Sequence, residues 1–277
     1  MPTVAEVIQR LTSSSEAILH TVDTLKAGSL DAEVHGIATT FIPSLTVLRR
    51  AAAHDLNLVI GHEAPFYHHR DEVNILADDP VYAGKLAFIK EHRQTIFRLH
   101  DWTHWTQPDQ IARGLVRDLG WDEYLDPVAP PRRPVIDVSP VTIPSTTLRE
   151  VALHVKDRLQ LSSVRVVGPL DMLCRRIAFG PGYRGSGALV IPLLQGPYDA
   201  VIAGEGQEWE APEYVRDAVA QGLSKALIIV GHLKSEEGGM KYLAHDLADL
   251  YPNLPVEFLP EEESLRAVGS YPASPAP

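Results

Sequence analysis

The spacing of apolar residues divides the chain into alternating helices and strands. Apolar positions three and four residues apart predict amphipathic helices, and short apolar runs between turn-forming residues predict buried strands. The first part of the chain predicts a helix over 3–27, interrupted near its serine run, and then strand, helix and strand over 35–62. A helix over 82–93, a strand over 95–100 and a helix over 108–121 continue the alternation. This order predicts a lobe built from βαβ units.

A proline-dense segment over 126–134 marks a boundary, because proline continues neither a helix nor a central strand. Beyond it, the predicted strands cover 135–143, 163–168, 174–180, 198–205, 225–232 and 255–260. The predicted helices cover 145–159 with Ser145 as N-cap, 187–195, 211–222 and 239–251. We therefore predict an α/β protein of two lobes, each a mixed sheet flanked by helices, with lobes over 1–125 and 126–268 and a disordered tail over 269–277.

The composition narrows the classes of function. No apolar run approaches the roughly 20 residues that span a bilayer, and the N-terminus lacks an apolar segment followed by a small-residue cleavage site. We therefore expect a cytoplasmic protein that does not associate with membranes. The formal net charge of -11 opposes binding to the phosphates of nucleic acids. The single cysteine, Cys174, leaves histidine and carboxylate groups as the ligands of any metal ion.

Histidine and acidic residues follow three of the predicted strands. In open α/β sheets, ligands gather beyond the carboxyl ends of the strands, so these side chains are expected to share one pocket. Imidazole nitrogen and carboxylate oxygen are the ligands that zinc, manganese and iron(II) prefer. The residues are His62 and Glu63 after the first strand, His100, Asp101 and His104 after the second, and His232 and Glu236 after the third.

Each motif also has a purely structural interpretation. A histidine at a strand end often satisfies backbone hydrogen bonds, and Glu236 could favour the dipole of a helix start. The segment HEAPF is no zinc-protease motif, because Phe66 stands where the second histidine would be. His68 and His69 lie beside Arg70 in a polar segment and are interpreted as solvated loop residues. Three such strand ends in one chain favour a metal site over coincidence.

A glycine-rich segment over 180–187 joins a predicted strand to a predicted helix. Backbone amides of such a loop can receive an anionic group. The segment lacks the Lys-Ser/Thr ending of a P-loop, so a turn that needs positive φ explains it equally well. Both interpretations remain open at this point.

Several motifs together resemble a known family. They are HGIATT, NLVIGHEAPF, RLHDWTH, GSG, VIAGE and VGHLKSE. With these motifs the chain resembles the NGG-interacting-factor-three-like dinuclear-metal proteins, also known as type 2 GTP cyclohydrolase homologues. The resemblance spans most of the chain and implies two α/β lobes with two divalent metal ions, such as zinc, manganese or iron, in the cleft between them. It also implies self-assembly into a homohexamer.

The resemblance implies a ligand set with two departures from the family pattern. Glu63 stands where the family has a second histidine, and His104 stands where it has an aspartate. If the two positions have exchanged ligand types, Glu63 and His104 should bind the same ion. The implied ligands are His62, Glu63, His104, His232 and the bridging Glu236, with Asp101 as the alternative to His104.

The function that the resemblance implies is hydrolysis by a metal-bound water, as in a GTP cyclohydrolase. The substrate would be small and anionic or nucleotide-like. The motifs GSG and VIAGE place its binding residues at Gly185, Ser186, Gly187 and Glu205. The alternative is a metal-binding or regulatory scaffold without catalytic activity. An open coordination position would distinguish an enzyme from such a scaffold.

Overall fold

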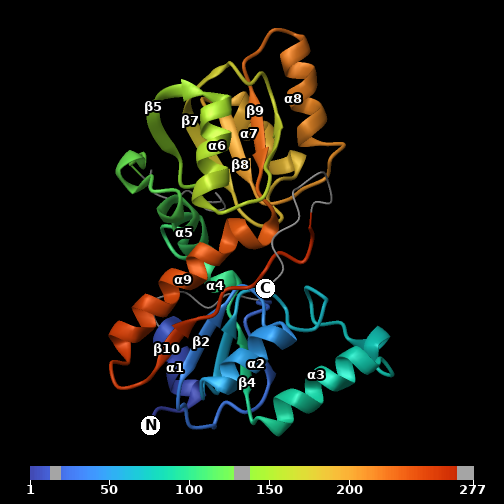
Figure 1. The fold of residues 1–277 in the computed structure, drawn as a ribbon, viewed down its shortest axis with the longest axis vertical. Helices are drawn as coiled ribbons and strands as arrows, with labels where there is room; N and C mark the ends of the chain where they lie inside the picture. Colours follow the sequence, from blue (N-terminus) through green and yellow to red (C-terminus); the bar gives the residue numbers. More distant parts are fainter. Residues whose placement is uncertain (13–19, 128–137, 267–277) are drawn as a thin grey trace, which may run out of the picture.

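Two five-stranded mixed sheets, each flanked by helices, form the two lobes of the chain (Figure 1). The computed structural model describes residues 1–12, 20–127 and 138–266. The predicted α/β fold with two mixed sheets is confirmed. The predicted tail and most of the proline-dense boundary lie outside the described residues.

The first sheet has the strand order β1-β4-β3-β2-β10. All neighbours are parallel except the edge strand β1, which runs antiparallel to β4. Its strands are β1 (Leu25–Ala27), β2 (Ile37–Thr40), β3 (Leu58–Gly61), β4 (Thr95–Arg98) and β10 (Val256–Phe258). One face packs against α1 (Val4–Thr12), and the other packs against α2 (Leu45–Ala53) and α3 (Pro80–Glu91). The three central strands are entirely buried, and the polar residues Thr39, Thr40 and Arg98 are buried with them.

The second sheet has the strand order β5-β7-β8-β9-β6, with three parallel central strands and an antiparallel strand at each edge. Its strands are β5 (Val141–Thr147), β6 (Arg165–Val167), β7 (Leu173–Gly180), β8 (Ala200–Ala203) and β9 (Ala226–Ile229). The helices beside it are α6 (Leu148–Arg158), α7 (Gly187–Gln195) and α8 (Ala211–Ala220). Short 3-10 turns cover Asn74–Leu76 and Asp122–Tyr124.

Two helices join the lobes (Figure 1). α5 (Gln110–Asp118) places Ile111 in the core of the first lobe and Leu115 in the core of the second. α9 (His232–Leu250) begins beside β9 of the second sheet and buries Met240 against the first. The chain then adds β10 to the first sheet. The segment over 126–268, which was expected to form the second lobe alone, therefore also contributes a strand to the first lobe.

Three predicted element boundaries differ from the structure. Within the described residues of the helix predicted over 3–27, α1 covers Val4–Thr12, and Leu25 pairs with Phe97 in the sheet instead. The N-cap of α6 is Thr147 rather than Ser145, because Thr147 and Glu150 form a reciprocal capping box. α9 begins at His232, several residues before the predicted start. In the described part of the chain, no helix is long and apolar enough to cross a membrane.

Three glycines allow α5 and α9 to cross at close range. Gly238 and Gly239 lie inside the helix, where they contact Gly114 of α5. A Cβ atom on Gly114 would lie 2.2 Å from the backbone nitrogen of Gly239, which real Cβ atoms do not approach. The two helix backbones therefore touch without intervening side chains. Glycine disfavours the interior of a helix, but at this crossing only glycine leaves room for the two backbones to touch.

We expect Gly114→Ala to lower the free energy of unfolding by about 1–3 kcal/mol, because the methyl group overpacks the crossing. Alanine's helix propensity offers roughly 1 kcal/mol in the opposite direction, and the clash with backbone atoms should outweigh it. Gly84→Ala in α3 is the control, since a Cβ there meets nothing within 4 Å. That control should be neutral or stabilising. Urea unfolding of both variants measures the difference, and equal effects would contradict the tight crossing.

A candidate metal centre between the lobes

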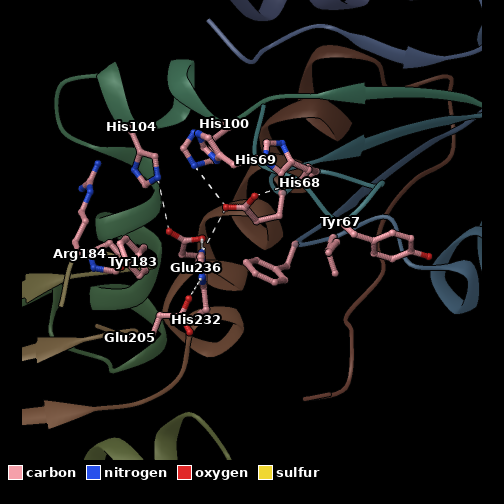
Figure 2. Close-up of a pocket in the computed structure, with 15 residues that line it drawn as sticks. Tyr67, His68, His69, His100, His104, Tyr183, Arg184, Glu205, His232 and Glu236 are labelled. Carbon is pink, nitrogen blue, oxygen red and sulfur yellow. Dashed lines mark hydrogen bonds and ion pairs between the residues drawn. The ribbon is translucent and has the colours of Figure 1, made fainter. Parts of the chain in front are cut away.

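The carboxyl ends of parallel strands from both sheets face one cavity of about 690 Å³ (Figure 2). His62 directly follows β3, and His100 lies two residues after β4. From the second lobe, Glu205 follows β8 and His232 begins α9 after β9. Strand ends position the site, as the sequence predicted.

Two imidazoles are oriented through their Nδ1 atoms. His62 is fully buried, and its Nδ1 lies 3.3 Å from the carbonyl oxygen of Leu99. The Nδ1 of His232 lies 2.9 Å from Oε1 of Glu205. A carbonyl and a carboxylate only accept hydrogen bonds, so each Nδ1 must carry the proton. In the neutral ring, Nε2 then keeps a lone pair for a metal ion.

His100 and His104 follow the same rule. Nδ1 of His100 lies 2.9 Å from Oδ1 of Asp101, and Nδ1 of His104 lies 3.0 Å from Oδ2 of Asp109. Asp109 also caps α5 and accepts a hydrogen bond of 2.8 Å from Arg184 of the second lobe. These carboxylates direct both Nε2 atoms toward the cavity.

Glu236 lies where several Nε2 atoms converge (Figure 2). Its Oε2 lies 3.2 Å from Nε2 of His62 and 3.0 Å from Nε2 of His232, and its Oε1 lies 3.7 Å from Nε2 of His104. Ligands roughly 2.0–2.2 Å from a tetrahedral ion stand about 3.3–3.6 Å from one another. The separations around Glu236 are close to this spacing.

Glu63 provides a second point of convergence. Its Oε1 lies 3.6 Å from Nε2 of His100 and 3.5 Å from Nε2 of His232. Its Oε2 accepts a hydrogen bond of 2.7 Å from the buried Arg98. One carboxylate oxygen therefore faces the imidazoles while the other is held by the guanidinium.

Two buried atoms at the centre indicate a missing partner. Among the described residues, Nε2 of His62 and Oε2 of Glu236 make no hydrogen bond of good geometry, although they lie 3.2 Å apart and buried polar atoms nearly always make such a bond. The adjacent Gly182 has a φ of +63°, and a Cβ there would lie 2.0 Å from Oε1 of Glu236. Position 182 in the loop after β7 must therefore be glycine if the carboxylate of Glu236 is to fit beside it. The donor set and its orphaned atoms fit a divalent cation.

Opposite charges offset burial within the centre. Burial alone would raise the pKa of Glu236, but the charges of His62 and His232 hold that pKa well below its usual range. Burial lowers the pKa of His232, and the contacts with Glu236 and Glu63 outweigh it and raise the pKa to about 11. For Glu63, burial is outweighed by His232, His62 and Arg98, which lower the pKa to about 2. The carboxylates therefore stay ionised and require nearby positive charge.

Ligand atoms within 4.8 Å of one another form three groups in the described residues: His62, His100 and His104; Glu63, His69 and His100; and His62, Glu63 and Glu236. None of these groups contains both Glu63 and His104. The geometry thus does not support the expectation that these two residues bind the same ion. Oε1 of Glu63 instead faces Nε2 of His100 and of His232, and Nε2 of His104 faces Oε1 of Glu236.

The structure brings together all five ligands that the resemblance implied. Asp101, the expected alternative, accepts hydrogen bonds from Val22 and Thr21 and orients His100 rather than facing the centre. His100, which the sequence placed among the candidate metal-binding residues but the resemblance left out of its ligand set, also faces the centre. The sequence reasoning missed four residues that hold or surround the centre: His69, Arg98, Asp109 and Arg184.

The glycine-rich loop differs from its anion-binding interpretation. The amide of Gly185 donates to the carbonyl of Glu205 at 2.9 Å, and the amide of Gly187 donates to the carboxylate of Glu210 at 2.7 Å. Ser186 is the N-cap of α7 without a side-chain capping bond. These two amides are engaged within the protein, and Tyr183 from the same loop lines the cavity. Glu205 also lines it, and its carboxylate orients His232.

Comparisons with known proteins agree with this fold. The family model described as Duf34/NIF3 (NGG1p interacting factor 3) matches residues 4–264. A comparison with curated proteins gave no match.

Similar solved structures include Staphylococcus aureus protein SA1388, with 18% identity, a TM-score of 0.74 and coverage of 96% of this chain and 99% of that one. A Bacillus cereus protein related to NIF3 has 14% identity, a TM-score of 0.70 and 99% coverage of both chains. Reduced HcgD from Methanocaldococcus jannaschii has 17% identity, a TM-score of 0.66 and coverage of 94% and 97%. At these identities the likeness establishes the fold alone.

We expect Glu205→Ala to weaken zinc binding about tenfold, because outer partners of metal-binding histidines typically contribute that much affinity. Glu205→Gln should bind more tightly than Glu205→Ala, since its amide oxygen still accepts from His232. Glu208→Ala is the control, because Glu208 contacts Arg165 on the surface. Competition with a chromophoric zinc chelator measures all three. Wild-type affinity in Glu205→Ala would contradict the orienting role.

Proposed function

The chain belongs to the Duf34/NIF3 family, as its motifs predicted, and on this premise we propose that it binds two divalent metal ions and hydrolyses a small substrate with them. The proposal rests first on one observation. Each of four imidazoles donates a hydrogen bond from Nδ1 to an acceptor, which turns its Nε2 atom toward two ionised glutamates. These imidazoles belong to His62, His100, His104 and His232.

The ligands suffice for two ions. Around one position, Glu63 would act with His100 and His232, and around the other, Glu236 would act with His62 and His104. Glu236 also lies 3.0 Å from Nε2 of His232, so it could bridge both ions. The second ion would then have fewer protein ligands than the first. An incomplete ligand set is what distinguishes catalytic from structural zinc sites.

The cavity supports an enzyme rather than a closed metal store. When bound, the ions would supply Lewis acidity that lowers the pKa of a coordinated water to about 7. The volume of about 690 Å³ lies within the range for small-molecule sites. Phe41, Tyr67 and Tyr183 line the cavity, so apolar parts of a substrate would meet aromatic side chains. Arg184 and His68 line the same cavity and could receive its anionic group.

A GTP cyclohydrolase is the most specific form of this proposal, and the family resemblance supports it. The aromatic and cationic lining fits a purine nucleotide, although the amides of Gly185 and Gly187 would not receive its phosphates. The alternative is a metal-binding scaffold without turnover. Its support is that the same histidine and glutamate groups would hold metal ions without any turnover.

We expect the purified protein to take up about two zinc ions per chain. Glu236→Gln should retain at most about one, because it removes the charge that neutralises the central ions. Glu237→Gln on the same helix is the matched control, since that carboxylate pairs with Lys234 outside the cavity. Elemental analysis after dialysis measures the stoichiometry. A wild-type value near zero after loading with zinc, manganese or iron(II) would refute the metal centre.

Hydrolysis is tested with a panel of phosphate esters and purine nucleotides that includes GTP. We expect metal-loaded protein to turn over at least one substrate, chelator treatment to abolish the activity and added metal to restore it. Glu237→Gln should remain active and Glu236→Gln should not. Full metal loading without turnover of any substrate would favour the scaffold.

A further inference from the structure

Arg98 at the end of β4 is fully buried beneath the metal centre and donates hydrogen bonds to three neighbours. Its Nε donates to the carbonyl of His62 at 3.1 Å, and its Nη1 donates to the carbonyl of His69. Its Nη2 lies 2.7 Å from Oε2 of Glu63 and 3.1 Å from Nδ1 of His69. Nη2 carries two hydrogens, so it can donate to both at once.

These contacts determine which nitrogen of His69 carries a proton. A guanidinium has no acceptor, so Nδ1 of His69 must be the acceptor of the contact with Arg98. The ring is then neutral, its proton lies on Nε2, and its lone pair on Nδ1 is occupied. His69 therefore has no free lone pair for a metal ion, although it lies within ligand distance of Glu63 and His100.

The four histidines of the metal centre show the opposite polarity. For His100 and His104 the Nδ1 partner is a carboxylate, which forces the proton onto Nδ1 and frees Nε2. His69 has a donor in that place. Proximity alone would count His69 as a ligand, and the hydrogen-bond polarity excludes it.

We propose that Arg98 is a positioning residue that selects the ligands of this centre: it holds Glu63 as a one-oxygen ligand and keeps His69 as a neutral hydrogen-bond donor outside the coordination sphere. This inference rests on the proposed metal binding. Because the guanidinium also neutralises Glu63, the pair carries no net charge, like the neutral imidazole that the family pattern has at position 63. His69 lines the cavity, so its Nε2–H group is available to an acceptor oxygen of a bound molecule.

The protonation of His69 is measured by nitrogen-15 NMR of the ring nitrogens in the full chain. The signals of His69 are those lost in His69→Gln. We expect a protonated Nε2 and an unprotonated Nδ1 in metal-free protein, unchanged when zinc is added, while the Nε2 of His100 shifts on zinc binding. A proton on Nδ1 of His69, or a zinc-induced shift of either of its nitrogens to a coordinated value, would overturn the assignment.

Substitutions test the consequence for the metal. His69→Gln should keep the wild-type zinc stoichiometry, whereas His100→Gln should lower it. Arg98→Lys keeps the charge, but lysine cannot reach all three partners, so zinc binding should weaken about 10–100-fold. In this variant the proton of His69 should also be distributed between Nδ1 and Nε2. Arg50→Lys is the matched control, since Arg50 contacts the carbonyl of Pro260 away from the cavity. Unchanged zinc affinity in folded Arg98→Lys would refute the positioning role.

The two proposals fail separately. If the wild-type protein takes up no metal, the proposed function is wrong, and the spectrum of metal-free protein still confirms or overturns the protonation of His69. If Arg98→Lys does not fold, that same wild-type spectrum and the zinc stoichiometry of His69→Gln decide the inference.

Discussion

The burial of ionised carboxylate between the lobes is the constraint on which the rest of the site depends. Glu236 is 2% exposed and stays ionised, and only positive charge in direct contact offsets the desolvation of such a carboxylate. Imidazoles supply that contact, and each is oriented by an acceptor of its own. Glu63 has the same need and is satisfied in part by Arg98. Burying several ionised carboxylates lowers the free energy of unfolding, and a bound cation would offset that loss.

The crossing of α5 and α9 positions several of the residues that surround these carboxylates. α9 carries His232 and Glu236 in its first turns and reaches its glycine contact with α5 directly afterwards. α5 is capped by Asp109, which orients His104 and pairs with Arg184 of the second lobe. The same backbone contact therefore fixes how α9, with His232 and Glu236, lies against α5, whose N-cap Asp109 orients His104.

The sequence predicted the alternation of elements and the strand ends well, because buried parallel strands are plainly apolar and polar residues at their ends stand out. It could not decide between His100, Asp101 and His104, since residues in one short helical turn point in different directions and spacing does not show which faces the cavity. The role of Glu205 was out of reach because its partner His232 lies 27 residues away along the chain. The packing of Gly238 and Gly239 against Gly114 was not visible in the sequence, because Gly114 is distant along the chain.

The return of β10 to the first sheet has a consequence for synthesis of the protein. On the ribosome, β2 emerges early, but its outer edge stays unpaired until residues 256–258 leave the exit tunnel. An exposed apolar strand edge is a hazard for mispairing with other chains. His232 and Glu236 emerge in the same late segment, so the nascent first lobe exposes Glu63 and His62 without their counterparts. Completion of the sheet and completion of the candidate metal centre thus both depend on the segment from His232 to Phe258.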